Sequence, residues 1–429
     1  MANLELTRRR GWLLAIMATL TMTVSIMDRG TLAVLAPTVT ATLGMSEVDY
    51  GWVNSAFSIA YLFCAPLAGR MIDRVGARRG LFVSVIVWSF VAALHALVPS
   101  FAILLLLRVA LGVAESPSFP GASQIVQRAL PLSDRARGYG ILLVGSALAG
   151  AIGPPLVTTL NARFGFRVAF LGSSAVAMLL WIPLWRWFAF APDARRALDA
   201  VPEASPGGDS PRAIALTTLM RHRAVIRMFI AMIAIAPSIA FWTVWSSKFL
   251  VARYHVDQNA LGRYLWVSPI FLDVGMVLFG DLASRRANAR RDGSPHRALF
   301  AVATLLAGTQ LAMALTPPIL VALAIMAVAS LGVGGYISLL TSETYGRVPA
   351  AAVSRVGGLF ASAQSLCFIV DYPLLGRLVQ GAGYPTVTVV TALMVLPGGL
   401  YFALGSAPAL HDERRAKRQD GALVDADGA

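Results

Sequence analysis

The sequence predicts an all-α polytopic membrane protein with 12 transmembrane helices arranged in two six-helix halves. Three observations support this prediction. Hydrophobic residues make up 57% of the chain and charged residues only 14%, whereas soluble domains carry about 25% charged residues. Apolar runs of spanning length follow one another along the chain. Basic residues gather in the connections that would face one side of a membrane.

Twelve apolar segments are long enough for a helix that crosses a bilayer, which takes roughly 20 residues. The first six lie at 12–38, 48–69, 80–98, 101–121, 138–160 and 167–190, and the second six at 224–251, 260–283, 298–316, 319–342, 354–380 and 385–407. They predict an N-terminal bundle over 1–190, a linker rich in Pro, Gly, Asp and Arg over 191–223, a C-terminal bundle over 224–407 and a disordered tail over 408–429. These segments leave no room for a sizeable soluble domain.

The distribution of basic residues predicts the topology. Of the 36 Lys and Arg residues, 26 fall in the segments that share a side with the termini and four in the segments on the opposite side. Cytoplasmic loops are enriched in Lys and Arg, so both termini are expected in the cytoplasm, in a bacterial inner membrane. This bias explains the net charge of +14 without a nucleic-acid partner. The first apolar run contains Asp28 and Arg29 and lacks a cleavage site, which favours an uncleaved helix.

The connection after the second apolar segment reads Gly69-Arg70-Met71-Ile72-Asp73-Arg74-Val75-Gly76-Ala77-Arg78-Arg79. Its glycines permit a tight turn with positive φ, and Asp73 is placed to pair with basic neighbours or a helix N-terminus. The loop resembles the major facilitator signature between helices 2 and 3. That resemblance implies the major facilitator fold, with its site between the two halves. It also implies that this cluster, with Gly69, Asp73, Arg74, Gly76 and Arg78, is a gate that holds the outward-facing state. In the second half, Ser284 replaces the aspartate.

Four charged residues lie inside predicted spans of the first half, where charge is costly and marks function. They are Asp28, Arg29, Arg108 and Glu115. Arg108 and Glu115 are seven positions apart and share a helix face, about 10 Å apart along the axis. That separation is too long for a direct pair, so each needs another partner or the substrate.

Three stretches of the first half resemble the anion:cation symporters, a family that includes hexuronate and hexonate transporters. They are Met27-Asp28-Arg29, the stretch from Arg108 to Pro120 and the stretch from Gly150 to Pro155. The resemblance implies that Asp28 and Glu115 take up the coupling proton. It implies that Arg29 binds a substrate carboxylate, that Arg108 is essential and that Tyr61 lines the site. Relatives carry a polar side chain on helix 5, where this chain has only Ser146.

The residues themselves agree with this implication. An organic anion needs a cation, and arginine offers a bidentate fork to a carboxylate. Desolvation favours the protonated form of a carboxylate, so we hypothesise competition. An ionised Asp28 or Glu115 neutralises an arginine, and protonation releases that arginine for the substrate. The alternative reading of these four residues is structural ion pairing between helices.

Candidates in the second half are less specific. Lys248 and Asp273 resemble the hexuronate branch of the family, as a substrate ligand and a further site residue. The alternative for Lys248, given equal weight, is that its ammonium group extends to the outer membrane–water interface. Gln364 is predicted to bind substrate. Tyr336 and Ser338 are candidate hydroxyl contacts or packing residues, and Asp371 a site or structural residue. Trp181, Trp185 and Trp187 are expected to be interface anchors.

The sequence therefore predicts a proton-coupled symporter that imports an organic anion, such as the hexuronates glucuronate and galacturonate. An antiporter or exporter of the same fold is the alternative, supported by the glycine-proline stretch from Gly150 to Pro155. A receptor or enzyme is disfavoured, because neither an output domain nor a catalytic motif is present. We expect no metal and no cofactor besides the coupling H⁺, a monomer, and the lipid bilayer and a small organic anion as partners.

Overall fold

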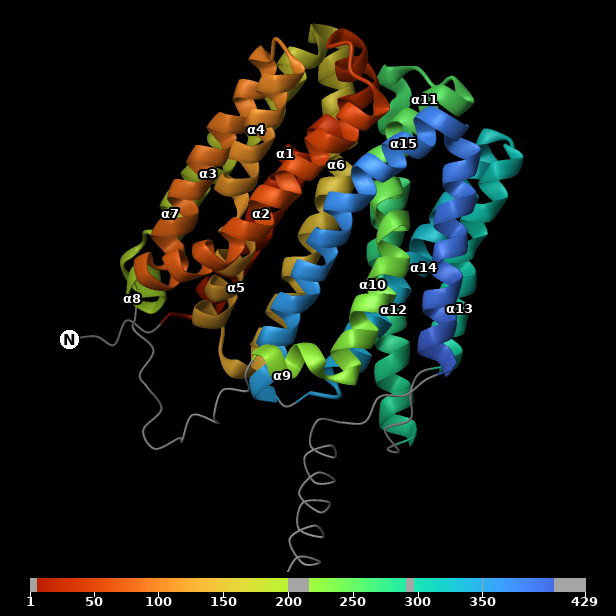
Figure 1. Cartoon of the computed structure of the whole chain (residues 1–429). Helices are drawn as coiled ribbons and strands as arrows, with labels where there is room; N and C mark the ends of the chain where they lie inside the picture. The colour runs from red at the N-terminus through yellow and green to blue at the C-terminus, as the bar shows by residue number, and fades with distance from the viewer. Residues whose placement is uncertain (1–5, 200–215, 291–296, 349, 405–429) are drawn as a thin grey trace, which may run out of the picture.

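The computed structural model describes residues 6–199, 216–290, 297–348 and 350–404 (Figure 1). The described part of the chain is helical and contains no strand. The helices of the first half are α1 (Arg8–Thr42), α2 (Glu47–Val75), α3 (Ala77–Leu94), α4 (Phe101–Glu115), α5 (Ser118–Ala129), α6 (Leu132–Val176) and α7 (Ile182–Ala189). Those of the second half are α10 (Arg223–Ala240), α11 (Ser246–Tyr254), α12 (Val267–Arg290), α13 (Arg297–Gly308), α14 (Ile319–Tyr345) and α15 (Ala350–Leu404).

Ten helical segments among the described residues are long and apolar enough to cross a membrane. Two of them contain two spans each. Helix α6 has 45 residues and α15 has 55, which would reach about 68 and 83 Å as straight helices, more than twice the ~30 Å hydrocarbon core. Both chains turn at a glycine with positive φ, Gly165 at 82° and Gly383 at 76°. Glycine adopts this conformation without steric cost. The predicted fold class with twelve spans is confirmed.

Other spans are built from consecutive short helices. Helices α4 and α5 form one apolar span that is interrupted beside Pro117, because proline has no backbone N–H to donate to a helical hydrogen bond. Two spans contain a π-helical turn, η2 (Ala177–Trp181) between α6 and α7 and η3 (Phe241–Trp245) between α10 and α11. Such turns frequently occur at functional sites.

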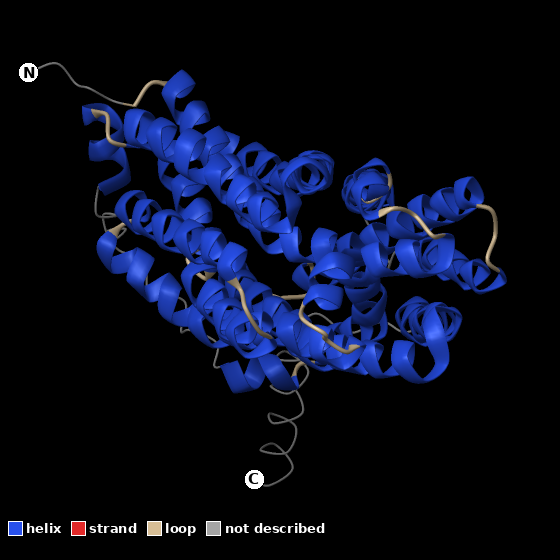
Figure 2. Ribbon diagram, turned by 90° about the horizontal axis from the view of Figure 1, so that it is seen from above, coloured by secondary structure: helices blue, strands red, loops and turns tan. Residues whose placement is uncertain are grey.

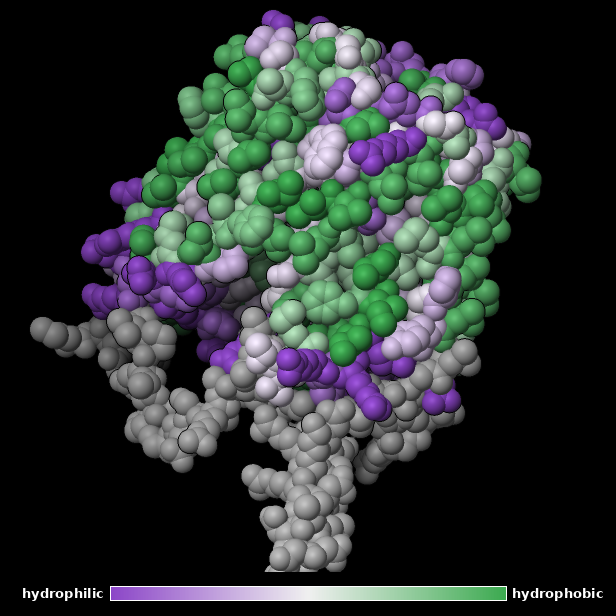
Figure 3. Space-filling view, viewed as in Figure 1, coloured by the Kyte–Doolittle hydropathy of each residue, from purple (hydrophilic) through white to green (hydrophobic). Residues whose placement is uncertain are grey.

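Figure 2 shows the two halves as two groups of helices side by side. Across the boundary, α2 packs along α15, and α6 packs against α12 and the short helix η4 (Gln258–Arg263). Helix α1 begins and α15 finishes at the same end of the molecule, here called the terminal end; the opposite end is the far end (Figure 1). Figure 3 shows apolar side chains covering the middle of the molecule, polar ones at both ends, and a hollow between the halves near the terminal end.

Small residues let helices within each half approach closely, as in other membrane bundles. A Cβ on Gly112 would lie 2.5 Å from the carbonyl oxygen of Phe57, and one on Gly145 would lie 2.8 Å from that of Thr19. These contacts join α4 to α2 and α6 to α1. They hold in place α1 and α4, the two helices that carry Asp28, Arg29, Arg108 and Glu115.

The tryptophan cluster differs from expectation. In the described parts of the predicted linker, 191–199 and 216–223, lie two short helices, α8 (Pro192–Asp199) and α9 (Leu216–Arg221); the predicted tail, 408–429, lies outside the described residues. The prediction that Trp181 and Trp185 are interface anchors is wrong. They stack with ring centroids 4.8 Å apart and are buried, because their indole N–H groups donate to Thr21 and to the carbonyl of Arg78. Trp187 is exposed.

Candidate functional site

The first charged pair of the site joins α1 to α4. A guanidinium nitrogen of Arg29 lies 3.0 Å from Glu115 Oε2. The Ser25 hydroxyl donates to the same oxygen at 2.8 Å and accepts from Arg29 at 3.0 Å. The Glu115 side chain is fully buried, whereas 33% of the Arg29 side chain is exposed. The arginine therefore has one face on the carboxylate and another open to a ligand.

Arg108 is a buried cation whose partners are all neutral. It donates to the carbonyl oxygen of Arg29 at 3.3 Å and to Asn54 Oδ1 at 3.2 Å. Its Nε is buried without a hydrogen-bond partner, and among the described residues it forms no ion pair. As the seven-residue spacing predicts, Arg108 and Glu115 do not pair directly. An unneutralised guanidinium at this depth is a site for an anion.

Asp28 forms no ion pair with either arginine in the described part of the chain. It is 3% exposed, and neither of its carboxylate oxygens accepts a hydrogen bond from the described part of the chain. Trp88 and Ser173 lie alongside it. A charged carboxylate in such surroundings is costly, so this environment suits the protonated acid.

Aromatic rings line the site between the two arginines. The Phe57 ring centroid lies 5.1 Å from the Arg29 guanidinium carbon and 5.7 Å from that of Arg108, and Tyr61 lies 5.7 Å from Arg29. Phe57 and Tyr61 stack on each other. The second half adds Tyr372, which is within electrostatic range of both guanidinium groups. Tyr61 thus lies beside Arg29, and its predicted part in the substrate site stays a prediction. The rings exclude water and strengthen charge interactions at the site.

The two halves contact each other at the far end through polar pairs. Lys248 Nζ lies 2.6 Å from Glu47 Oε2, and both Tyr50 and Trp245 face this ammonium. Tyr50 donates to the carbonyl of Val244 at 2.9 Å. Three more bonds cross at this end, Ser247 to the Ala33 carbonyl, Gln258 to the Val34 carbonyl and Asn161 to Asn259. Lys248 is only 8% exposed, so it does not reach out to an interface; its predicted contact with substrate stays a prediction.

The remaining second-half candidates are dispersed. Asp273 accepts a hydrogen bond of 2.6 Å from Ser146 across the two halves. Tyr336 is fully buried in the core of the second half and packs on Phe300, which makes it a packing residue. Asp371 is 8% exposed, with Oδ2 unpaired. Gln364 and Ser338 are partly buried, on α15 and α14.

The signature loop lies at the terminal end. Gly76 has φ 85°, as its place in the motif predicts. Asp73 is exposed and accepts from Gln124 at 3.1 Å, and Gln124 accepts from the Ala77 amide at the N-terminus of α3. In this state no ion pair of Asp73 is found among the described residues, and its predicted role in the gate stays a prediction. Arg78 instead donates to Asp199 of α8 at 3.0 and 2.5 Å. These bonds hold the pKa of the Asp199 carboxyl below its usual range. Gly69 and Arg74 lie on the last turns of α2, with Arg74 exposed.

Three polar residues of the site were not predicted. Asn54 orients Arg108, Ser25 bridges Glu115 and Arg29, and Glu47 pairs with Lys248. Asn54 and Ser25 are neutral and resemble many other polar residues in the spans, but each lies one to two turns from a predicted charge or aromatic. Glu47 begins a helix, where an acidic residue is expected for capping alone. Across the described ranges, no three His, Cys, Asp or Glu side chains meet as metal ligands would.

The sequence profile of the Major Facilitator Superfamily matches residues 18–371. The hexuronate transporter of Escherichia coli K12 is 24% identical over 414 residues, which cover 93% of this chain and 95% of that protein. A probable sulfoacetate transporter of Cupriavidus necator is 27% identical and covers 84% and 85%. In structure, a bacterial homologue of the human lysosomal transporter Spinster, crystallised inward-facing and unoccupied, aligns with a TM-score of 0.77, 18% identity and coverage of 93% and 97%.

Proposed function

Because the chain belongs to the major facilitator superfamily and is a membrane transporter rather than an enzyme, we propose that it imports an organic anion together with protons. The proposed substrate is a sugar acid such as glucuronate or galacturonate. One observation carries the proposal. The buried Arg108 and the partly exposed Arg29 lie side by side, and a single carboxylate, Glu115, neutralises Arg29.

The substrate class is supported by the relatives. Proteins named as transporters of hexuronate and of D-galactonate align over nearly their whole lengths. Their substrates are monocarboxylates with several hydroxyl groups. Arg29 presents an open face to such a carboxylate, and Arg108 supplies a second positive charge that no ion pair satisfies. Bidentate arginine–carboxylate bonds give both affinity and orientation.

Proton coupling follows from competition for Arg29. When Glu115 is ionised, it holds Arg29 with help from Ser25. When Glu115 is protonated, its attraction for the guanidinium falls, and the substrate carboxylate takes its place. Asp28 precedes Arg29 in the chain, and its carboxylate oxygens have no hydrogen-bond partner among the described residues. We therefore assign it as the second proton-carrying group. The loaded site thereby keeps a near-neutral charge, which lowers the cost of moving it through the membrane interior.

The basic-residue bias together with the closed end indicates the inward-facing state, in which an importer releases its substrate. That bias assigns the terminal end to the cytoplasm. The far end, where Lys248 pairs with Glu47, then faces the periplasm and is closed, and the hollow between the halves opens inward (Figure 3). Return of the halves to the outward-facing state reloads the site with substrate and protons.

A thermal-shift screen of carboxylates on the purified protein tests the substrate class. Glucuronate or galacturonate is expected to raise the unfolding temperature, because a ligand that binds only the folded state stabilises it. Neutral sugars of the same size are the control and should have no effect. Stabilisation by aromatic acids alone would contradict the proposal.

A further inference from the structure

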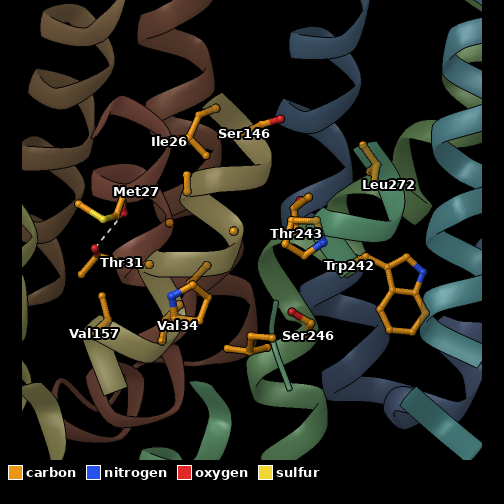
Figure 4. A pocket seen from close by; sticks show the side chains of 18 of the residues that line it. Ile26, Met27, Thr31, Val34, Ser146, Val157, Trp242, Thr243, Ser246 and Leu272 are labelled. Carbon is orange, nitrogen blue, oxygen red and sulfur yellow. Dashed lines mark hydrogen bonds between the residues drawn. The ribbon is translucent and has the colours of Figure 1, made fainter. Parts of the chain in front are cut away.

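A cavity of about 230 Å³ lies between α1 and α6 of the first half and η3 and α12 of the second. Figure 4 shows its side chains projecting from both halves. Most of the wall is apolar. Met27 and Gly30, which flank Arg29 in α1, belong to this wall. The cavity therefore adjoins the turn of α1 that carries Arg29.

Asp273 is the charged group of the cavity wall, and Ser246 adds a hydroxyl to it. Two hydroxyls of the wall are already engaged within their own helices, Thr31 with the Met27 carbonyl at 2.9 Å and Thr243 with the Ile239 carbonyl at 2.7 Å. Asp273 accepts from Ser146 through Oδ2, and among the described residues its Oδ1 accepts no hydrogen bond. This carboxylate thus has open acceptor capacity towards the cavity.

Trp242 is an aromatic residue of the same cavity wall. Its indole N–H donates to Gln310 at 2.9 Å, which fixes the ring. A carboxylate accepts short, strong hydrogen bonds from hydroxyl groups, and an aromatic ring offers a flat apolar face. Sugars present hydroxyl groups at their edges and C–H groups on their faces. A wall that contains both Asp273 and Trp242 suits that chemistry.

We infer that Asp273 and Ser146 recognise the hydroxyl end of the substrate and reject a second carboxylate there. This inference rests on the proposed function. A substrate hydroxyl donates to Asp273 and replaces or joins the Ser146 hydroxyl. A dicarboxylate bound by Arg29 would bring its other negative charge towards Asp273, and like charges in a site of low dielectric repel strongly. The chain is therefore selective for monocarboxylic sugar acids, through an unfavourable contact with the competitor.

Ser146 also places this recognition at the boundary between the halves. Its bond to Asp273 joins α6 to α12, and one turn further along α6 Gly150 lies against Pro269, where a Cβ would be 2.5 Å from the proline ring. When a substrate hydroxyl replaces Ser146 as the donor to Asp273, the hydrogen bond between α6 and α12 is lost. Occupancy of the hydroxyl end is thereby connected to the packing of one half on the other.

Calorimetric titration of purified protein with D-galacturonate and galactarate tests the inference. Galactarate carries a second carboxylate in place of the aldehyde carbon. The unsubstituted protein should bind galacturonate about tenfold more tightly than galactarate. Asp273→Asn should bring the two affinities closer together, because the variant binds galactarate more tightly. A misfolded protein would not gain affinity for galactarate. Asp281→Asn is the matched control on the same helix, because Asp281 pairs with Arg285 at the surface, and it should leave the ratio unchanged.

Two other outcomes are distinguishable. If the unsubstituted protein binds galacturonate but the ratio is near one, or Asp273→Asn leaves it unchanged, the inference is wrong and the proposed function stands. If the unsubstituted protein binds neither compound, the proposed function fails and this inference fails with it.

Discussion

At the scale of single residues, the site is an imbalance of charge. Arg29 and Arg108 are adjacent, Glu115 neutralises Arg29, and Asp28 has no partner among the described residues. Removal of one member of a buried ion pair costs about 3–5 kcal/mol because the other is left uncompensated. When Glu115 is protonated, a substrate carboxylate can take its place beside Arg29. The arginine then keeps a negative partner, and that cost is avoided.

Glu115→Gln tests this exchange. The amide cannot be deprotonated, so Arg29 stays available for substrate, while the proton no longer drives its release. Exchange of labelled substrate across a membrane should persist, and proton-driven accumulation should be lost. Counterflow and uptake in proteoliposomes measure the two activities separately. Loss of both in a folded protein would contradict a coupling role.

Asn54 is a positioning residue for Arg108. Asn54→Ala removes the side chain that holds the guanidinium, and we expect about tenfold weaker substrate binding, in line with the loss of a hydrogen bond to a charged group. Asn54→Asp should weaken binding further, because the new carboxylate neutralises Arg108. Ser58→Ala, one turn along α2, is the control, since Ser58 bonds only to the Asn54 carbonyl. Equal binding by all three variants would exclude the role of Asn54.

How far the sequence predicts these residues depends on their chemistry. Charges inside apolar spans are rare and costly, so Asp28, Arg29, Arg108 and Glu115 could be predicted. The neutral side chains that hydrogen-bond to them could not be predicted from the sequence. Asn54 and Ser25 acquire their role only when α1, α2 and α4 pack together, and the packing depends on close contacts such as that of Gly112 with Phe57.

At the scale of elements, the pair of Lys248 on α11 and Glu47 on α2 closes the far end. Glu47→Lys should open it, because two ammonium groups repel, and the exchange Glu47→Lys with Lys248→Glu should restore closure. The reporter is a cysteine at Thr40, a buried residue of this end, in a protein with Cys64 and Cys367 replaced by serine. Its labelling by a membrane-impermeant maleimide should accelerate about tenfold in the single variant. Equal labelling in all variants would show that the pair is no gate.

Helix α8 is fixed to the terminal end of the first half by ion pairs. Arg10 pairs with Asp193, Arg78 with Asp199, and Arg128 donates to the Leu198 carbonyl. The folded-state pKa of Asp199 is depressed, so its contribution to stability is present above the unfolded value of about 3.9 and is lost as pH falls through the lower folded value.

Thermal unfolding of Asp199→Asn and the unsubstituted protein between pH 3 and 7 measures that contribution. The difference in unfolding temperature should be constant above pH ~5 and should shrink at lower pH, as the carboxylate takes up its proton. Asp49→Asn, at the far end, is the control. A difference that grows as pH falls would contradict the assigned pair.

Elements were predictable where one signal dominates. The breaks at Gly165 and Gly383 fall between the predicted segments on either side. Helix α8 was not predicted, because its own composition is typical of a loop and its helix is stabilised by contacts with other elements. Likewise Trp181 and Trp185 have the sequence pattern of interface residues, and only packing against α1 and α3 buries them.

At the scale of the whole molecule, the twelve spans follow from sequence because hydrophobicity and basic-residue bias act along the entire chain. The conformational state does not follow from it, since one sequence must stabilise two arrangements of the same halves within a few kcal/mol. In the structure the far end is closed by pairs such as Tyr50 with Val244. At the terminal end, the signature loop contacts α5 and α8, which belong to its own half and the linker.

The central claim is that protons and an organic anion move together in one direction, and uptake by proteoliposomes under an imposed pH gradient tests it most directly. With an alkaline interior, the account predicts that labelled galacturonate accumulates above its external concentration while the interior acidifies, and that Glu115→Gln abolishes this accumulation. Accumulation that requires a Na⁺ gradient, or movement of protons opposite to the substrate as in an antiporter, would contradict the account.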